Sequence, residues 1–190
     1  TILKQAETIT DHLSRIVFPA FSLDRGGGCE IHENAYWGLQ TYLGLRERLA
    51  ANEGARSFIH ESTRDRTPLG HAHRGHIRDL SIQQIREMYR QAVTQLLNEV
   101  AETEQFFRAG IVAIDITEAD PFTGDRTGHE TEIWDEKNSN EYAYQWATVQ
   151  LVGNAVPVVL DARPVRKGES RKEIAEDLLD SAEDLVHVDN

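Results

Sequence analysis

The chain has 190 residues, enough for one domain of ordinary size or two small ones with a buried core. Its 20 arginines and lysines face 32 aspartates and glutamates, a formal net charge of -12. No stretch approaches the roughly 18 apolar residues of a membrane-spanning helix, which argues against an integral membrane protein. The single cysteine, Cys29, excludes an internal disulfide framework and favours a cytoplasmic protein. The chain starts at Thr1 without a methionine, as a fragment or a processed product would.

The basic residues are unevenly distributed. Only four of the 20 are lysines, which fits a protein that stays hydrated in concentrated salt, or an ordinary acidic cytoplasmic protein. Residues 1–40 have a net charge of -2, residues 41–90 of +3 and residues 91–190 of -13. The middle segment also contains four histidines. A locally basic segment inside an acidic chain is compatible with binding of nucleic acid.

Periodic apolar residues predict a helical first half. Helices are expected over residues 35–50 and 55–62, from Thr67-Pro68 to residue 80, and from Ser81 to residue 100, the last opened by a capping box with Gln84. The third helix would carry His71, Arg74 and Arg78 on its outward face. Such an arrangement is typical of a helix-turn-helix that places one helix in a DNA groove. A plain helical bundle with a solvated arginine face explains the same pattern.

The second half predicts strands. Residues 110–117 form a β-branched run that is expected to be a central strand buried on both faces. Residues 142–152 alternate and residues 156–160 follow after a turn at Gly153-Asn154, which predicts a hairpin. A helix is then expected from a capping box of Ser170 and Glu173, and a fourth strand from residue 186. The fold class is therefore α/β: a helical region, 1–105, then an incomplete ribonuclease-H-like domain, 106–190.

Asp115 is the one carboxylate in that first strand, between Ile114 and Ile116. A buried carboxylate must find a partner, take up a proton or bind a metal. One interpretation is that it caps a loop or pairs with an arginine. The other is that it is a metal ligand to which a phosphodiester could approach.

These segments resemble a known family. Residues 113–117 with Pro121-Phe-Thr-Gly124, then residues 142–148, 162–165 and 169–185, are similar in order and spacing to the first-Asp region of DDE transposases encoded by insertion sequences of salt-loving archaea. The resemblance implies that Asp115 is the first catalytic acid and binds Mg²⁺ or Mn²⁺, with the second acid expected just after Asn190 and the third further on. It also implies a homodimer that cleaves transposon ends and transfers strands into target DNA. There are two alternatives. One is a non-catalytic DNA-binding or regulatory remnant of a transposase. The other is a stand-alone nuclease of the same fold, which would need further acids.

Three further patterns carry weaker expectations. A zinc site of His71, His73 and His76 with Cys29 and His32 is disfavoured, because His71 and His73 would point about 200° apart on a helix. The acidic segment 120–136 is expected to be a solvated loop. The aromatic row Tyr142, Tyr144 and Trp146 is expected to pack in the core, with stacking on a distorted DNA end as the alternative.

Overall fold

The computed structural model describes residues 11–23, 25–26, 28–46, 49–62, 65–101, 109–122, 133–138, 141–153, 157–166 and 168–188. The chain divides into two compact units, 1–96 and 97–190, and the division falls within helix α5 (Ile82–Val100). The predicted boundary between 105 and 106 lies outside the described residues. Each unit is described by itself. In the described part of the chain, no helix is both long enough and apolar enough to cross a membrane.

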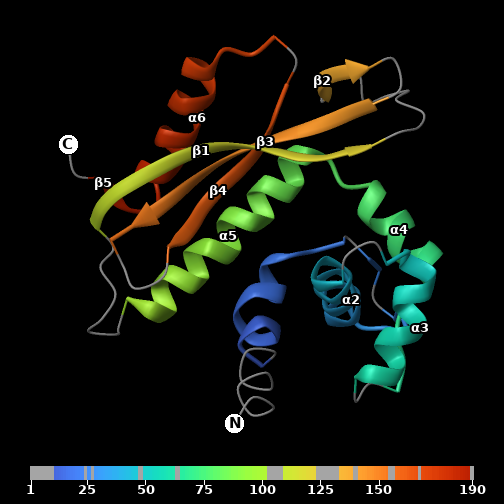
Figure 1. Ribbon diagram of the computed structural model, residues 1–190. Helices are drawn as coiled ribbons and strands as arrows, with labels where there is room; N and C mark the ends of the chain where they lie inside the picture. Colours follow the sequence, from blue (N-terminus) through green and yellow to red (C-terminus); the bar gives the residue numbers. More distant parts are fainter. Residues whose placement is uncertain are drawn as a thin grey trace. The chain divides into compact units, whose positions relative to one another are not determined.

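The N-terminal unit is helical, as predicted (Figure 1). Its elements are a π-helical turn η1 (Leu13–Val17), a 3-10 turn η2 (Phe18–Ala20), and the helices α2 (Glu33–Leu45), α3 (Ala51–Glu61), α4 (Gly70–Arg78) and the first part of α5. The capping box at the start of α5 is confirmed, since Gln84 N donates to Ser81 Oγ and Ser81 N donates to Gln84 Oε1. The sequence pattern of α5 predicts an apolar stripe of Ile82, Ile85, Tyr89, Val93, Leu96 and Val100, which is only partly correct. Val93 is buried as expected, but Ile85 is exposed, and Met88 and Ala92 are buried instead.

A small aromatic cluster forms the core of this unit. Phe18, Leu23, Tyr36 and Trp37 are buried together, and partly buried residues including Ile77 of α4 pack against them. The Trp37 indole N–H donates to the carbonyl of Phe21 at 3.0 Å, which satisfies the one polar atom that this large side chain buries. The cluster therefore joins the N-terminal turns to α2 and α4.

Helix α4 begins later than the sequence predicts. Its first residue is Gly70, and Leu69 rather than Thr67 occupies the N-cap position, without a side-chain hydrogen bond. At its start α4 approaches α3 closely: a Cβ on Gly70 would lie 2.4 Å from both Ala51 C and Asn52 N. No Cβ fits at that distance from backbone atoms, so a glycine is required where the two helix starts meet.

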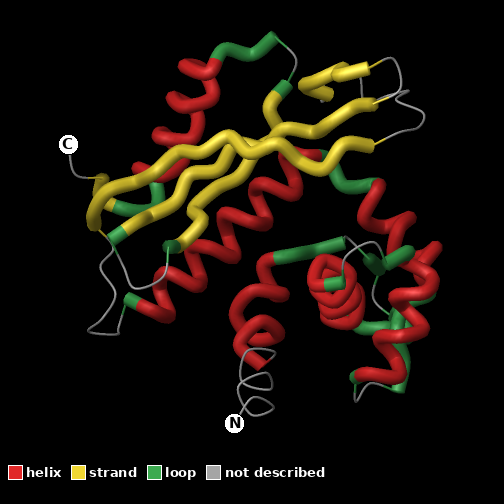
Figure 2. The backbone as a smooth tube through the Cα atoms, in the orientation of Figure 1, coloured by secondary structure: helices red, strands yellow, loops and turns green. Residues whose placement is uncertain are grey.

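The C-terminal unit is a mixed sheet with a helix, so the α/β class is confirmed. Its elements are β1 (Ala109–Phe122), β2 (Ile133–Asn138), β3 (Glu141–Val152), β4 (Val158–Val165), α6 (Arg171–Glu183) and β5 (His187–Val188). Among the described residues β3 pairs antiparallel with β1 on one side and with β2 and β4 on the other, and β5 pairs parallel with β1 (Figures 1 and 2). Strand β2 lies in the segment expected to be a loop, most of which is outside the described residues.

Strand β1 is not buried on both faces, contrary to the prediction. Exposure alternates along it: Ile111, Ala113 and Asp115 are exposed, whereas Val112, Ile114 and Ile116 are partly buried. In the register of the sheet Ile114 lies beside Val149, which is fully buried, and Asp115 lies beside Thr148. β1 therefore buries one face, and the apolar run reflects strand propensity on the other.

Helix α6 covers the buried face of this sheet (Figure 1). Its predicted capping box is confirmed, since Glu173 N donates to Ser170 Oγ. The sequence pattern also predicts an apolar stripe of Ile174, Leu178, Ala182 and Leu185, and all four are buried. The helix is also joined to β4 by polar contacts. Ser181 Oγ donates to the buried carboxylate of Asp161 at 2.8 Å, and Arg163 pairs with Glu169 and with Asp177.

Candidate functional site

The predicted DNA-binding residues lie together on α4. His71, Arg74 and Arg78 are all exposed, and their spacing of three and four residues places them on one face of the helix. Gly75, four residues after His71, belongs to the same face. Arg78 Nε forms an ion pair with Asp79 Oδ1 at 3.8 Å, and both side chains are largely exposed. Such an exposed pair contributes little and leaves the guanidinium able to exchange it for another anion.

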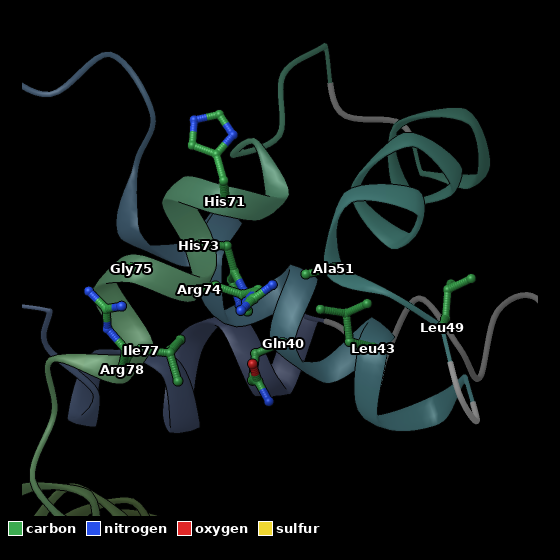
Figure 3. Close-up of a pocket in the computed structure, with 10 residues that line it drawn as sticks. All are labelled: Gln40, Leu43, Leu49, Ala51, His71, His73, Arg74, Gly75, Ile77 and Arg78. Atoms are coloured by element: carbon green, nitrogen blue, oxygen red, sulfur yellow. The ribbon is translucent and has the colours of Figure 1, made fainter. Parts of the chain in front are cut away.

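This face borders a cavity of about 640 Å³ in the N-terminal unit (Figure 3). The cavity lies between α4, α2 and the start of α3. Its lining joins apolar residues to the three predicted DNA-binding residues and comprises Gln40, Leu43, Leu49, Ala51, His71, His73, Arg74, Gly75, Ile77 and Arg78. Figure 3 shows Arg74 extending in the direction of Ala51, whereas His71 points away from the cavity. Arg74 is therefore better placed than His71 to hold a ligand there.

His73 is the functional candidate that the sequence analysis missed. Helical periodicity placed it on the apolar face, and it is indeed 3% exposed. Neither ring nitrogen has a hydrogen-bond partner among the described residues. Burial, and next the charge of His76, lower the pKa of His73, so the ring is neutral. The ring stacks on Tyr36 with centroids 6.4 Å apart, and the guanidinium of Arg25 lies 4.2 Å from the centroid of that tyrosine.

The helix geometry departs from a standard helix-turn-helix. Helices α3 and α4 pack together, but residues 62–69 separate them, whereas the turn of that motif has three or four residues. The short connection, residues 79–81, instead joins α4 to α5. The connection before α4 is therefore longer than a helix-turn-helix arrangement would require. The exposed basic face of α4 does not depend on that turn.

Asp115 stands on the exposed side of β1. In register it lies beside Thr148 of β3, which in turn lies beside Ala162 of β4. The neighbouring position Thr117 pairs with Trp146, an aromatic side chain that is 43% exposed. Because alternate residues of a strand share a face, Trp146 and Thr148 lie on the same side of β3, the side opposite the buried Ala147 and Val149. Expected core packing of Trp146 is therefore only partial, and Tyr142 lies outside the described side chains.

A complete metal site is not found in the described part of the chain, which contains no group of three or more histidine, cysteine, aspartate or glutamate side chains able to hold an ion. Asp115 nevertheless fits as one ligand, because Mg²⁺ is commonly held by one or two carboxylates and otherwise by water and phosphate oxygens. Two residues of the disfavoured zinc site, Cys29 and His32, form hydrogen bonds within the protein instead. His32 Nδ1 accepts from Asn34 N at the start of α2, and Cys29 Sγ donates to the Gly26 carbonyl.

Comparison of the chain with models of protein families, with curated proteins and with solved structures finds no match.

Proposed function

We propose that this protein binds DNA through the basic face of α4 and belongs to a metal-dependent DNA-processing enzyme of the DDE transposase type. The observation that supports DNA binding is the exposed set of His71, Arg74 and Arg78 on one helix face of an otherwise acidic protein. Guanidinium groups pair with phosphate oxygens or with the edge of guanine, and a helix of nine residues is suited to the major groove.

The strand arrangement supports the enzymatic part of the proposal. Strands β1, β3 and β4 are antiparallel neighbours in that order across the sheet, with β2 between β1 and β3 in the chain and paired with β3. Helix α6 follows β4, and β5 lies beside β1 in parallel. Apart from β2, this order supports the expected ribonuclease-H-like sheet. Residues paired between β1 and β5 are 78 positions apart in the sequence. If a longer chain continued β5 in the same register, the residue 78 positions after Asp115 would lie beside it, at the usual strand spacing of about 4.8 Å. An acid there would supply a second ligand for Mg²⁺ or Mn²⁺, which would polarise phosphate and activate the attacking hydroxyl.

DNA binding is tested with the double variant Arg74→Ala with Arg78→Ala. The DNA is a labelled duplex with the end sequence of the transposable element that contains the gene. We expect the affinity of the variant for this duplex to fall about tenfold at 0.1 M salt. The magnitude of the slope of log K against log salt should decrease by about two, because two phosphate contacts are lost. Fluorescence anisotropy measures both. The matched control is Arg166→Ala with Arg171→Ala, which removes the same charge from exposed positions of the C-terminal unit. Equal affinities of the two double variants would contradict the proposal.

The metal role of Asp115 is tested separately. Mn²⁺ added to ¹⁵N-labelled protein is expected to broaden the amide resonances of Ile114 to Ile116 and of Thr148, because these lie next to the Asp115 carboxylate. Asp115→Asn should lose this broadening, whereas Asp180→Asn, which changes an exposed carboxylate of α6, should keep it. Identical broadening of β1 in the wild type and in Asp115→Asn would show that Asp115 does not bind the metal.

A non-catalytic DNA-binding protein is the second candidate. The observation that favours it is that the basic face and its cavity lie entirely within residues 1–96 and require nothing from Asp115. Loss of DNA affinity in the arginine variant, together with no Mn²⁺ effect at β1, would select this candidate.

A further inference from the structure

His73 of α4 is a titratable side chain that is buried without a polar partner. The residue is 3% exposed, and neither Nδ1 nor Nε2 forms a hydrogen bond with any of the described residues. A neutral imidazole has one N–H donor, whereas an imidazolium has two and carries a charge. Protonation in this place would bury that charge together with two donors that lack a described partner, which is far more costly than burial of the neutral ring. The packed form of α4 therefore favours neutral His73.

The groups in contact with His73 do not stabilise a charge on it. The imidazole stacks on Tyr36 of α2, with ring planes 15° apart. Tyr36 already attracts one cation, because the guanidinium of Arg25 lies 4.2 Å from the centroid of its ring, and this charge would repel a second one. His76 meets the same tyrosine edge-on. Burial lowers the pKa of His73, and the charge of His76 lowers it further.

The carboxylates on the surrounding helices are occupied or exposed. Glu33 of α2 accepts a hydrogen bond from Leu23 N, and Asp79 at the end of α4 pairs with Arg78. The third ionisable side chain of α2, Tyr42, packs on Phe58 of α3. The other ionisable side chains of α3 and α4 are exposed: Glu53, Arg56, His60, Glu61, His71, Arg74 and Arg78. No described carboxylate opposes the effect of burial and of His76 on the pKa of His73.

We propose that the contact of His73 with Tyr36 is a pH-sensitive switch: His73 takes up a proton from water only when α4 separates from α2, so acid shifts the N-terminal unit to an open form. In the open form the imidazole is solvated and has its ordinary pKa of about 6.5, whereas the pKa in the packed form is lower. The packed form is therefore fully stable above about pH 6.5 and loses stability as the pH falls below that value. The consequence for DNA rests on the proposed function, since α4 would then release DNA in acid.

Hydrogen exchange of the α4 and α2 amides in the full chain at pH 7, 6 and 5, corrected for the intrinsic exchange rate, measures the opening constant. Uptake of one proton on opening should raise this constant about threefold from pH 7 to 6 and up to about eightfold from pH 6 to 5. His73→Phe keeps an aromatic ring against Tyr36 and cannot take up a proton, so the ratio of the wild-type constant to that of the variant should rise by these factors. The matched control is His60→Gln, at an exposed position of α3, for which the ratio should stay constant within about twofold. A constant ratio for His73→Phe would overturn the proposal.

A measurement on the wild type keeps the test decisive if His73→Phe does not fold. Ring ¹³C–¹H correlation spectra distinguish neutral from charged imidazole. We expect the His73 resonance of the folded protein to keep the shift of the neutral ring below pH 6, and the charged form to appear only together with resonances of the open unit. A folded-state resonance that titrates with a midpoint near pH 6.5 is the contrary result. Neither measurement uses DNA, so the effect of the arginine variant on duplex binding bears on the proposed function alone.

Discussion

Replacing Asp161 with alanine is expected to lower the free energy of unfolding of the C-terminal unit by about 3 kcal/mol. The carboxylate of Asp161 is fully buried and accepts hydrogen bonds from Ser181 Oγ and from Ala162 N, both at 2.8 Å. Alanine would leave the buried Ser181 hydroxyl and the partly buried Ala162 N–H without this acceptor, along with a void in the contact between β4 and α6. A urea titration followed by amide resonances of β3 and α6 measures the change for this unit alone.

Two further variants make that result specific. Asp161→Asn retains a carbonyl acceptor and nearly the same shape, so the expected loss is about 1 kcal/mol. Asp180→Ala removes an exposed carboxylate next to Ser181 on α6 and should change stability by less than about 0.5 kcal/mol. If Asp161→Ala unfolds at the same urea concentration as Asp180→Ala, the polar contact does not hold the helix on the sheet.

Gly70→Ala is expected to destabilise the N-terminal unit by about 2 kcal/mol, since even one added methyl group must displace a well-packed backbone. The added Cβ would lie 2.4 Å from two backbone atoms of α3, which must therefore move away. Gly75→Ala is the matched control in the same helix. There a Cβ meets nothing, and the helix should gain about 0.5–1 kcal/mol from the better propensity of alanine.

The two glycine variants are thus predicted to have opposite signs. Urea titration followed by amide resonances of α2 and α3 gives both values. A stabilising Gly70→Ala would mean that α3 and α4 do not approach each other as closely as described.

Local signals in the sequence predicted the local structure well. The capping box at Ser170 and the stripe of Ile174, Leu178, Ala182 and Leu185 specify where α6 begins and which side it buries, because both depend on residues within a few positions of each other. The alternation in β3 likewise predicted a strand with two different sides, but the expected core side, the row with Trp146, is the more exposed one, and Ala147, Val149 and Leu151 are buried instead. The capping box, the stripe and the alternation itself needed no knowledge of distant neighbours.

The failures concern contacts between distant segments. The apolar run around Asp115 predicts a strand, but whether one face or two are covered depends on where α6 packs, 55 or more positions later. The requirement for a glycine at the start of α4 could not be predicted either, because it comes from the backbone of Ala51 and Asn52 in α3. Periodicity placed His73 on the buried side of α4, yet the lack of a hydrogen-bond partner depends on what α2 and the other elements place around it.

The parallel pairing of β1 with β5 has a consequence for the rate of folding. Ala109 meets His187 across 78 positions, and closing so long a loop carries a large entropic penalty before any contact compensates for it. The contacts of α2 with α3 and of α3 with α4 are much more local. Folding rates fall as contacts become more distant in sequence, and the N-terminal end leaves the ribosome first. The helical unit is therefore expected to reach its native packing while the sheet still lacks β5.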